Sequence, residues 1–544
     1  MRFPRWAAPR VVLASWLALM LYVPTASAQF FAPALRTLDI DTEQLSRSAR
    51  LLGMGGLTLV VPDHNTTYSL WDMARIPVAI TDDDSTSTMD VDPGSDALSA
   101  VHTLADGRER QNLAARRTGS GIEAVYRSRE SGGGFGYVGD LSNLRYDQPV
   151  TAGAELRQSV LRPAGTAILT GVVPRFFHRR LQWGLHLRFL NETVDRQYRE
   201  IVSNAAGEYI DLGGGELPPP TEFVLTSLDV NTTAYGLSTS YTLGKSTHIA
   251  LGIEHENNRF KGTNALDKST YETDETRPSW NGQAAIVSQI GHTFEWGVNG
   301  IGRVSNSEVD WRFTISNGVG AVPLSGRGNM LSRDEKSSEM QARARWTPGK
   351  TGRTVVSGEM HTAASKILTD PPNANDATSL NRFINDAYHS NTPAAAGLTL
   401  PDSVIHGETR RYAVGGSGGV SHRFTSNTVG VEYHWSRDVS TTQQLGDGPR
   451  RVDWDIRGGL EHPLGKVITG RLGYQYHSVD EDEFTTGNEF KANAFSLGLG
   501  YAPPGATWTL ESGYRVEFRT QDFNDPTDER QSRQNLGIEV LWKF

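Results

Sequence analysis

The last nine residues of the chain alternate between apolar and polar side chains. One parity is apolar and ends in an aromatic residue: Leu536, Ile538, Val540, Trp542 and Phe544. The other parity is mostly polar or small: Gly537, Glu539 and Lys543, continuing from Asn535. Successive side chains of a strand point to opposite faces, so this pattern predicts a strand with one wholly apolar face. Such a face suits a barrel wall in contact with lipid, and the alternative is the last strand of a soluble sandwich.

The same alternation recurs through much of the chain. Clear runs lie at residues 181–189, 429–435, 452–461, 468–477, 495–501 and 508–519. Several reach ten or more residues, whereas strands of globular proteins usually have about five or six. A tilted strand that crosses a bilayer needs about 9–11 residues, so the run lengths favour a membrane barrel over a sandwich.

The connections between these runs fall into two classes of length. Short ones lie at residues 178–180, 244–246, 289–293, 347–353, 424–427, 463–466 and 502–506. Long polar stretches lie at residues 194–222, 261–278, 316–335, 369–408, 441–450, 480–491 and 521–533. Short periplasmic turns and long outer loops are typical of outer-membrane barrels. We therefore predict an all-β fold, a transmembrane antiparallel β-barrel of about 14–16 strands spanning residues 116–544.

The C-terminal strand resembles the signature of bacterial outer-membrane β-barrels that the barrel-assembly machinery reads. The residues that carry the resemblance are Ile538, Val540, Trp542 and Phe544. The resemblance implies that these residues form the assembly signal, and that outer-membrane lipid and the assembly machinery are partners of the chain.

The first 28 residues have the three parts of a secretory signal peptide. Arg2, Arg5 and Arg10 form a basic region, residues 11–23 are apolar, and Ala26-Ser27-Ala28 is a small-residue cleavage site. The apolar part is too short to span a bilayer as a helix. A cleaved signal peptide and a barrel strand in one chain predict a Gram-negative cell outer membrane.

Composition agrees with this class. The chain has no cysteine, so no disulfide stabilises it. Its formal charge is -9, and removal of the signal peptide, with three arginines and no acid, leaves -12. An acidic chain argues against nucleic acid as a partner. The mean hydropathy of -0.42 is too polar for a helical membrane protein, but a barrel needs apolar residues only at alternate positions.

Residues 29–115 do not have the pattern of barrel wall, and we expect a plug or periplasmic segment there. Gly53, Met54, Gly55, Gly56 and, further on, Asp63 resemble the amino-terminal segment of the FadL-like and PorV-like outer-membrane families. The Asn-Pro-Ala-Gly that follows in those families is replaced here. The resemblance implies a segment at or inside the barrel mouth, with uptake of small hydrophobic molecules or a secretion-accessory role. The alternative is a glycine-rich turn that packs closely.

No pattern of residues predicts catalysis. The histidines are scattered along strands and lie outside any recognisable nucleophile or zinc-ligand motif, so we expect no enzyme, no catalytic residues and no cofactor. The aspartates at residues 82–84, 90, 92 and 96 do not have the spacing of a calcium loop, so no metal site is predicted.

The predicted lumen-facing residues carry both signs of charge. They include Asp453, Asp455, Arg457, Glu461, Arg471, Glu511, Arg515 and Glu517. The function we expect is a passive, porin-like channel or transporter for small molecules, hydrophobic ones included. The alternative is a structural or secretion-accessory barrel whose outer loops dock partner proteins, and an outer-membrane enzyme is a weaker third hypothesis.

Overall fold

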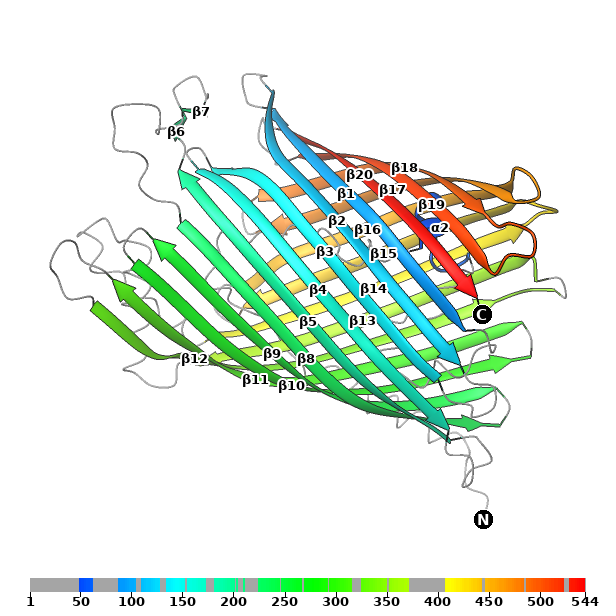
Figure 1. Ribbon diagram of the computed structural model, residues 1–544, viewed down its shortest axis with the longest axis horizontal. Helices are drawn as coiled ribbons and strands as arrows, with labels where there is room; N and C mark the ends of the chain where they lie inside the picture. The colour runs from blue at the N-terminus through cyan, green and yellow to red at the C-terminus, as the bar shows by residue number, and fades with distance from the viewer. Residues whose placement is uncertain are drawn as a thin grey trace, which may run out of the picture.

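The computed structural model is dominated by long antiparallel strands (Figure 1). The residues that it describes are 48–61, 87–103, 109–127, 134–151, 154–172, 181–200, 202–203, 209–210, 224–244, 246–266, 269–291, 293–315, 324–349, 352–370, 407–442, 446–483, 486–522 and 528–543. The predicted signal peptide, Asp63 and Phe544 lie outside these residues. No helix among the described residues is long and apolar enough to cross a membrane.

Eighteen strands form the main sheet. They are β1 (Thr88–Thr103), β2 (Glu109–Arg127), β3 (Gly134–Thr151), β4 (Ala154–Val172), β5 (Leu181–Glu200), β8 (Val224–Leu243), β9 (Thr247–Leu266), β10 (Ser269–Ile290), β11 (Phe294–Ile315), β12 (Leu324–Trp346), β13 (Thr354–Asp370), β14 (Gly407–Arg423), β15 (Thr428–Thr442), β16 (Gly446–Pro463), β17 (Ile468–Glu483), β18 (Thr486–Tyr501), β19 (Trp508–Asp522) and β20 (Asp528–Lys543). The short strands β6 (Val202–Ser203) and β7 (Tyr209–Ile210) pair only with each other.

The sheet returns on itself. Each strand pairs antiparallel with the next along the chain, with β5 pairing directly with β8. The last strand then pairs with the first, from Thr88 opposite Lys543 to Thr103 opposite Asp528. This closing ladder makes the sheet a barrel, which leaves no free strand edge.

Two expectations from the sequence are wrong in detail. The barrel has 18 strands, not about 14–16, and its wall begins at Thr88, not at residue 116. The strands that lie before or across the expected start of the barrel are β1 and β2. Pro93 and Gly94 in the middle of β1, with acidic residues around them, have the composition of a loop. Across these residues the register with β20 passes from the pair Val91–Val540 to the pair Gly94–Gly537.

Side chains alternate between the two faces of the wall. On β5, Leu185, Leu187 and Phe189 are exposed on the outside, with Leu187 63% exposed, while His186 between them is 4% exposed. The same exterior set of leucine, isoleucine, valine and aromatic residues recurs around the ring. A closed antiparallel barrel with an apolar, aromatic exterior and a polar interior is the architecture of outer-membrane proteins. The predicted all-β transmembrane barrel in an outer membrane is confirmed.

Short turns connect the strands at the end of the barrel where the C-terminus lies (Figure 1). Gly244, Gly291 and Gly505 have φ of 74°, 65° and 74° in these turns, a conformation that favours glycine. At the other end, residues 261–278 were expected as a loop but are mostly strand, because β9 runs to Leu266 and β10 starts at Ser269. Their polar composition reflects a wall that continues beyond the lipid.

Candidate functional site

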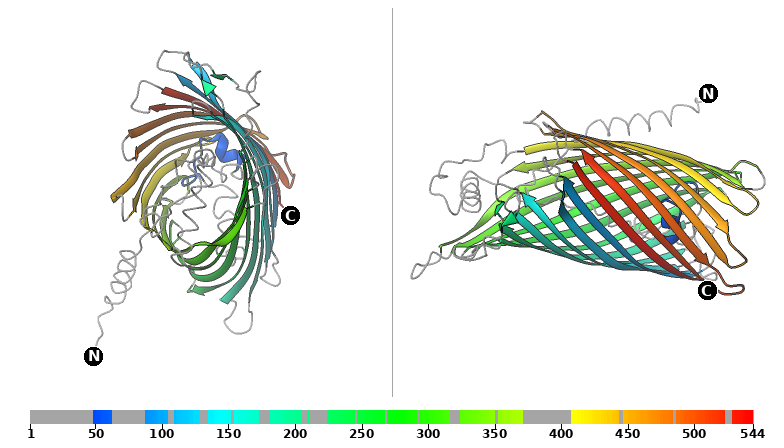
Figure 2. Two further views of the ribbon diagram at one scale, coloured as in Figure 1. Left: turned by 90° about the vertical axis from the view of Figure 1, so that its left-hand side faces the viewer. Right: turned by 90° about the horizontal axis from the view of Figure 1, so that it is seen from above.

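A short N-terminal segment lies inside the barrel (Figure 2). It comprises residues 48–61 and contains the helix α2 (Ala49–Gly53), which contacts β17, β18, β19 and β20. Met54, Leu57 and Val60 are fully buried, and they belong to one apolar cluster with Leu51 and neighbouring residues of the segment. We call residues 48–61 the lumen segment.

The wall beneath the lumen segment is built from glycines that face one another across strands. Gly430, Gly459 and Gly473 are successive partners on β15, β16 and β17. Gly498, Gly513 and Gly537 are successive partners on β18, β19 and β20. We call these six residues the glycine track.

The glycine track allows the main chain of the lumen segment to lie directly on the main chain of the wall. A Cβ atom on Gly473 would stand 2.1 Å from the backbone nitrogen of Gly55, and one on Gly513 would stand 2.3 Å from the carbonyl oxygen of Ala49. Atoms cannot approach so closely, so any side chain at these two positions would displace the segment.

The Gly-Met-Gly-Gly pattern has a structural explanation on the segment side of the same contact. A Cβ atom on Gly53 would lie 2.8 Å from the Cα of Gly498. Gly55 and Gly56 have φ of 75° and 80°, which favours glycine. Gly53, Gly55 and Gly56 of the motif thus lie against the wall, and their role as a plug stays a proposal.

One buried carboxylate holds the far end of the lumen segment. Glu432 on β15 is fully buried, and it accepts the backbone N–H groups of Thr58 (3.0 Å), Leu59 (2.6 Å) and Val60 (2.9 Å). Ser421 on β14 donates its hydroxyl to the carbonyl oxygen of Val60 at 2.6 Å. Hydrogen bonds to an ionised acceptor are stronger than neutral ones, so this cluster fixes the segment firmly.

An ion pair and hydrogen bonds to the main chain hold the rest of the lumen segment. Arg50 donates to both carboxylate oxygens of Glu461, at 2.8 and 3.0 Å, and Glu461 also accepts the Nε–H of Arg471 at 2.8 Å. Glu539 accepts the backbone N–H of Ala49 at 2.9 Å, and Arg457 donates to the carbonyl oxygen of Gly56 at 2.9 Å. The inward position predicted for Glu461, Arg471 and Arg457 is thus confirmed.

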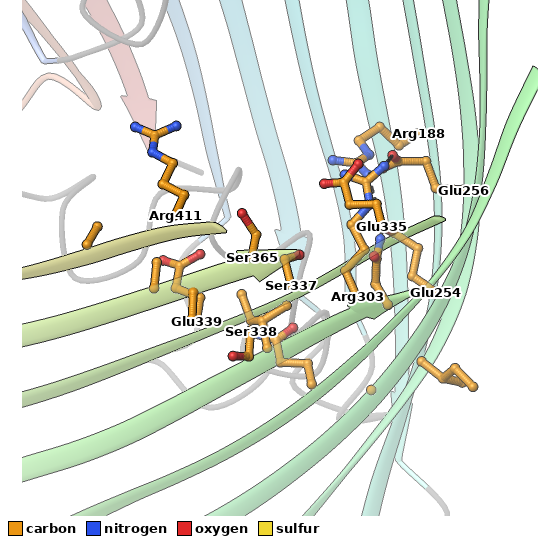
Figure 3. A pocket seen from close by; sticks show the side chains of 18 of the residues that line it. Arg188, Glu254, Glu256, Arg303, Glu335, Ser337, Ser338, Glu339, Ser365 and Arg411 are labelled. Atoms are coloured by element: carbon orange, nitrogen blue, oxygen red, sulfur yellow. Dashed lines mark hydrogen bonds and ion pairs between the residues drawn. The ribbon is translucent and has the colours of Figure 1, made fainter. Parts of the chain in front are cut away.

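A cavity of about 560 Å³ lies in another part of the lumen. Its lining comes from β5 and from β9 to β14, and Figure 3 shows charged and hydroxyl side chains converging on it. On one side, Arg188, Glu254, Glu256, Arg303 and Glu335 gather together (Figure 3). Ser337, Glu339, Ser365 and Arg411 lie across from them.

The charged side of the cavity is an organised network. Glu254 accepts hydrogen bonds from Arg188 (2.9 Å) and Asn281 (2.8 Å) and contacts Nε2 of His186 at 2.6 Å. Glu256 accepts hydrogen bonds from Arg303 at 2.9 Å and from Arg188. Such cross-strand pairs stiffen the wall, and they present both signs of charge to whatever enters the lumen.

The remaining predicted site residues have different positions. Ile538 and Trp542 point outward and are each 37% exposed, as a lipid-facing strand requires, and Val540 shares their parity. Among the aspartates weighed as calcium ligands, Asp96 pairs with Arg533 at 2.6 Å. Within the described parts of the chain, no three acidic or histidine side chains are grouped so that they could hold a metal ion.

Sequence reading missed Glu432, the glycine track and the cavity. The inward parity of Glu432 follows from its exposed neighbours Val431 and Tyr433, but its contacts with the lumen segment lie more than 370 positions away along the chain. The glycines align only when the strand registers are known. No local pattern in the sequence marks Glu432 or the glycine track.

Comparison with known proteins finds likeness at the level of fold. A FadL homologue of Pseudomonas aeruginosa is 11% identical, over 91% of this chain and 98% of that one, with a TM-score of 0.35. The toluene transporter TodX of Pseudomonas putida is 10% identical, over 91% and 96%, with a TM-score of 0.32. The ferric citrate transporter FecA is 10% identical, over 84% and 78%, with a TM-score of 0.42. No protein-family model and no curated protein matches the sequence.

The FadL-like resemblance expected from the N-terminal segment is therefore confirmed as a weak structural likeness. The identities and TM-scores are too low to say what this chain transports. Any account of its function depends on its own lumen.

Proposed function

We propose that this protein is an outer-membrane channel or transporter for small molecules, and that the lumen segment acts as its plug. The observation that carries the proposal is the fit of residues 48–61 to the wall. Glycines on both partners meet at backbone contact, and Glu432, Glu461 and Glu539 anchor the segment at both ends. A segment held inside a barrel narrows the path through it.

The cavity favours polar solutes. Its charged network and the hydroxyls of Ser337 and Ser365 offer hydrogen bonds of both kinds to a solute. A hydrophobic molecule would have to remove water from these groups without replacing their hydrogen bonds, which costs free energy. Of the small molecules considered from the sequence, polar ones therefore fit this lumen better than hydrophobic ones.

Planar-bilayer recordings test the plug. A variant that lacks residues 50–74 is expected to conduct more than the intact protein, because the segment no longer fills the lumen. Equal conductance of the two folded proteins would contradict the proposal. If both are silent and a partner protein co-purifies through residues 369–408, the secretion-accessory function is the better account.

Liposome-swelling assays test the class of solute. The deletion variant should admit small sugars and amino acids faster than liposomes without protein do. Uptake of these polar solutes no faster than in protein-free liposomes would favour the hydrophobic substrate implied by the FadL-like resemblance.

A further inference from the structure

Three basic residues form a row on the outer face of β12, β13 and β14. Lys336 lies directly opposite Lys366, and Lys366 lies directly opposite Arg410. We call these three residues the basic row. Like charges at directly opposed positions on neighbouring strands destabilise a sheet unless an opposite charge lies nearby.

The basic row faces away from the lumen. The residues next to it along each strand, Glu335, Ser365 and Arg411, line the lumen cavity, so the alternation directs the row to the exterior. The side chain of Arg410 is 50% exposed and that of Lys366 is 25% exposed. The row is therefore accessible from outside the barrel.

The basic row lies at the edge of the apolar belt. Met360, which is 65% exposed, lies on the exterior with Tyr412 and Val414, between the basic row and the short turns. Lys336 is ten positions from Trp346, which lies at the turn end of β12. That distance is about 33 Å along a strand, and a tilt of about 35–45° reduces it to about 25 Å of depth, the height of the apolar band. The row is therefore level with the headgroups of the distal leaflet.

Nearby acids do not cancel the charge of the row. Glu408 contacts Lys366 at 3.3 Å and Arg410 at 2.9 Å, and Asp334 lies two positions from Lys336 on the same face. Three cations and two anions leave a net positive charge. Lys336 has no ion pair with any residue in the described part of the chain.

We propose that the basic row binds a phosphate group of a lipid in the outer leaflet, with the acyl chains of that lipid lying on Met360 and Val414. Lysine and arginine are the usual ligands of phosphate, and their cationic N–H groups form charge-assisted hydrogen bonds with its oxygens. A phosphate balances the positive charge that remains after Glu408 and Asp334 are counted, and the adjoining apolar wall receives the acyl chains. The site is independent of the lumen and of the proposed plug.

The test is lipid binding to the full, detergent-purified protein, measured by native mass spectrometry. The probes are diphosphoryl lipid A, its dephosphorylated form and inorganic phosphate. The variant carries Lys336→Gln, Lys366→Gln and Arg410→Gln. The matched control carries Arg259→Gln, Lys261→Gln and Arg312→Gln, which remove equal charge from outward positions. There Arg259 and Arg312 pair with Asp274 and Glu272, and Lys261 lies opposite Asp274.

The basic-row variant is expected to bind diphosphoryl lipid A at least about tenfold more weakly, since all three cations that attract the phosphate are removed. The control should bind as the unaltered protein does. Unchanged binding by the basic-row variant, or equal loss in the control, overturns the proposal. Tight binding of the dephosphorylated lipid excludes phosphate recognition, and displacement of the lipid by inorganic phosphate excludes a lipid site.

Heat-modifiable migration on gels establishes that each variant is folded. If the triple variant fails to fold, the single Lys336→Gln change takes its place, because Lys336 has no ion pair among the described residues. A several-fold loss is then expected. Binding equal to that of the unaltered protein overturns the proposal in this form as well.

Discussion

At the scale of single residues, the lumen segment depends on one carboxylate and a few missing side chains. Glu432 accepts three consecutive backbone N–H groups, and it is the sole acid that reaches Thr58, Leu59 and Val60 among the described contacts. The glycine track contributes in the opposite way, since its members provide space. Each kind of residue can be tested by a single substitution.

Replacement of Glu432 by glutamine should loosen the far end of the lumen segment. The amide accepts fewer and weaker hydrogen bonds, and loss of charge-assisted bonds costs about 1.5–3 kcal/mol. Hydrogen exchange at Thr58–Val60 should accelerate while exchange in β15 is unchanged. Glu339→Gln, which alters a cavity-lining acid away from the segment, is the control. Equal protection in the two variants would refute the role of Glu432.

Replacement of Gly473 by alanine should displace the lumen segment from the wall. The added methyl group would overlap the backbone of Gly55, and overpacking of this kind costs about 1–3 kcal/mol, or about a 5- to 150-fold shift toward the unseated form. Channel conductance is expected to rise. Gly302→Ala is the matched control, because a Cβ atom there meets nothing within 4 Å. A rise in conductance in the control alone, or in neither variant, would contradict the proposed contact between Gly473 and the lumen segment.

At the scale of elements, different strands line different parts of the lumen. The lumen segment lies mainly on β14 to β20, with one further contact from Arg343 of β12, whereas the lumen cavity is lined by β5 and β9 to β14. The exterior of the last strand, β20, is lipid-facing at Leu536, Ile538 and Trp542, and β20 also closes the barrel against β1. A defect in β20 therefore affects both the membrane surface and the closure.

Changing Trp542 and Phe544 together to aspartate should block assembly. Both residues belong to the predicted assembly signal, and a charge on the lipid face destabilises a barrel strand. The measurement is the heat-modifiable fraction in outer-membrane preparations, which should fall to near zero. Lys543→Gln, between the two positions, should assemble normally. A normal folded yield of the double variant would count against the signal.

At the scale of the whole molecule, the alternation of apolar and polar residues predicted the barrel and its inward charges correctly. It failed at β1, because Pro93, Gly94 and the acids of that strand have loop composition and only pairing with β2 and β20 makes them wall. It could not find Glu432 or the glycine track, because both act through contacts between residues hundreds of positions apart. Local pattern determines the face of a side chain, whereas register determines its partner.

The location of the molecule is directly measurable. We expect cleavage after Ala28 and recovery of the mature chain in the outer-membrane fraction after a high-pH wash, since the basic, apolar and small-residue parts of a signal peptide precede a barrel. N-terminal sequencing of that fraction should begin at Gln29. Mature protein that is soluble in the periplasm would contradict both expectations.

The contact between Ala49 and Glu539 joins residues 490 positions apart, so the first described part of the chain rests on the last strand to be made. Contacts of such long sequence separation form late, because the intervening chain must first be ordered. The part of the wall that α2 contacts does not exist until β17 to β20 have paired. During biogenesis, protease protection of residues 48–61 should therefore lag behind the heat-modifiable barrel, and the open pore should exist briefly before it is filled.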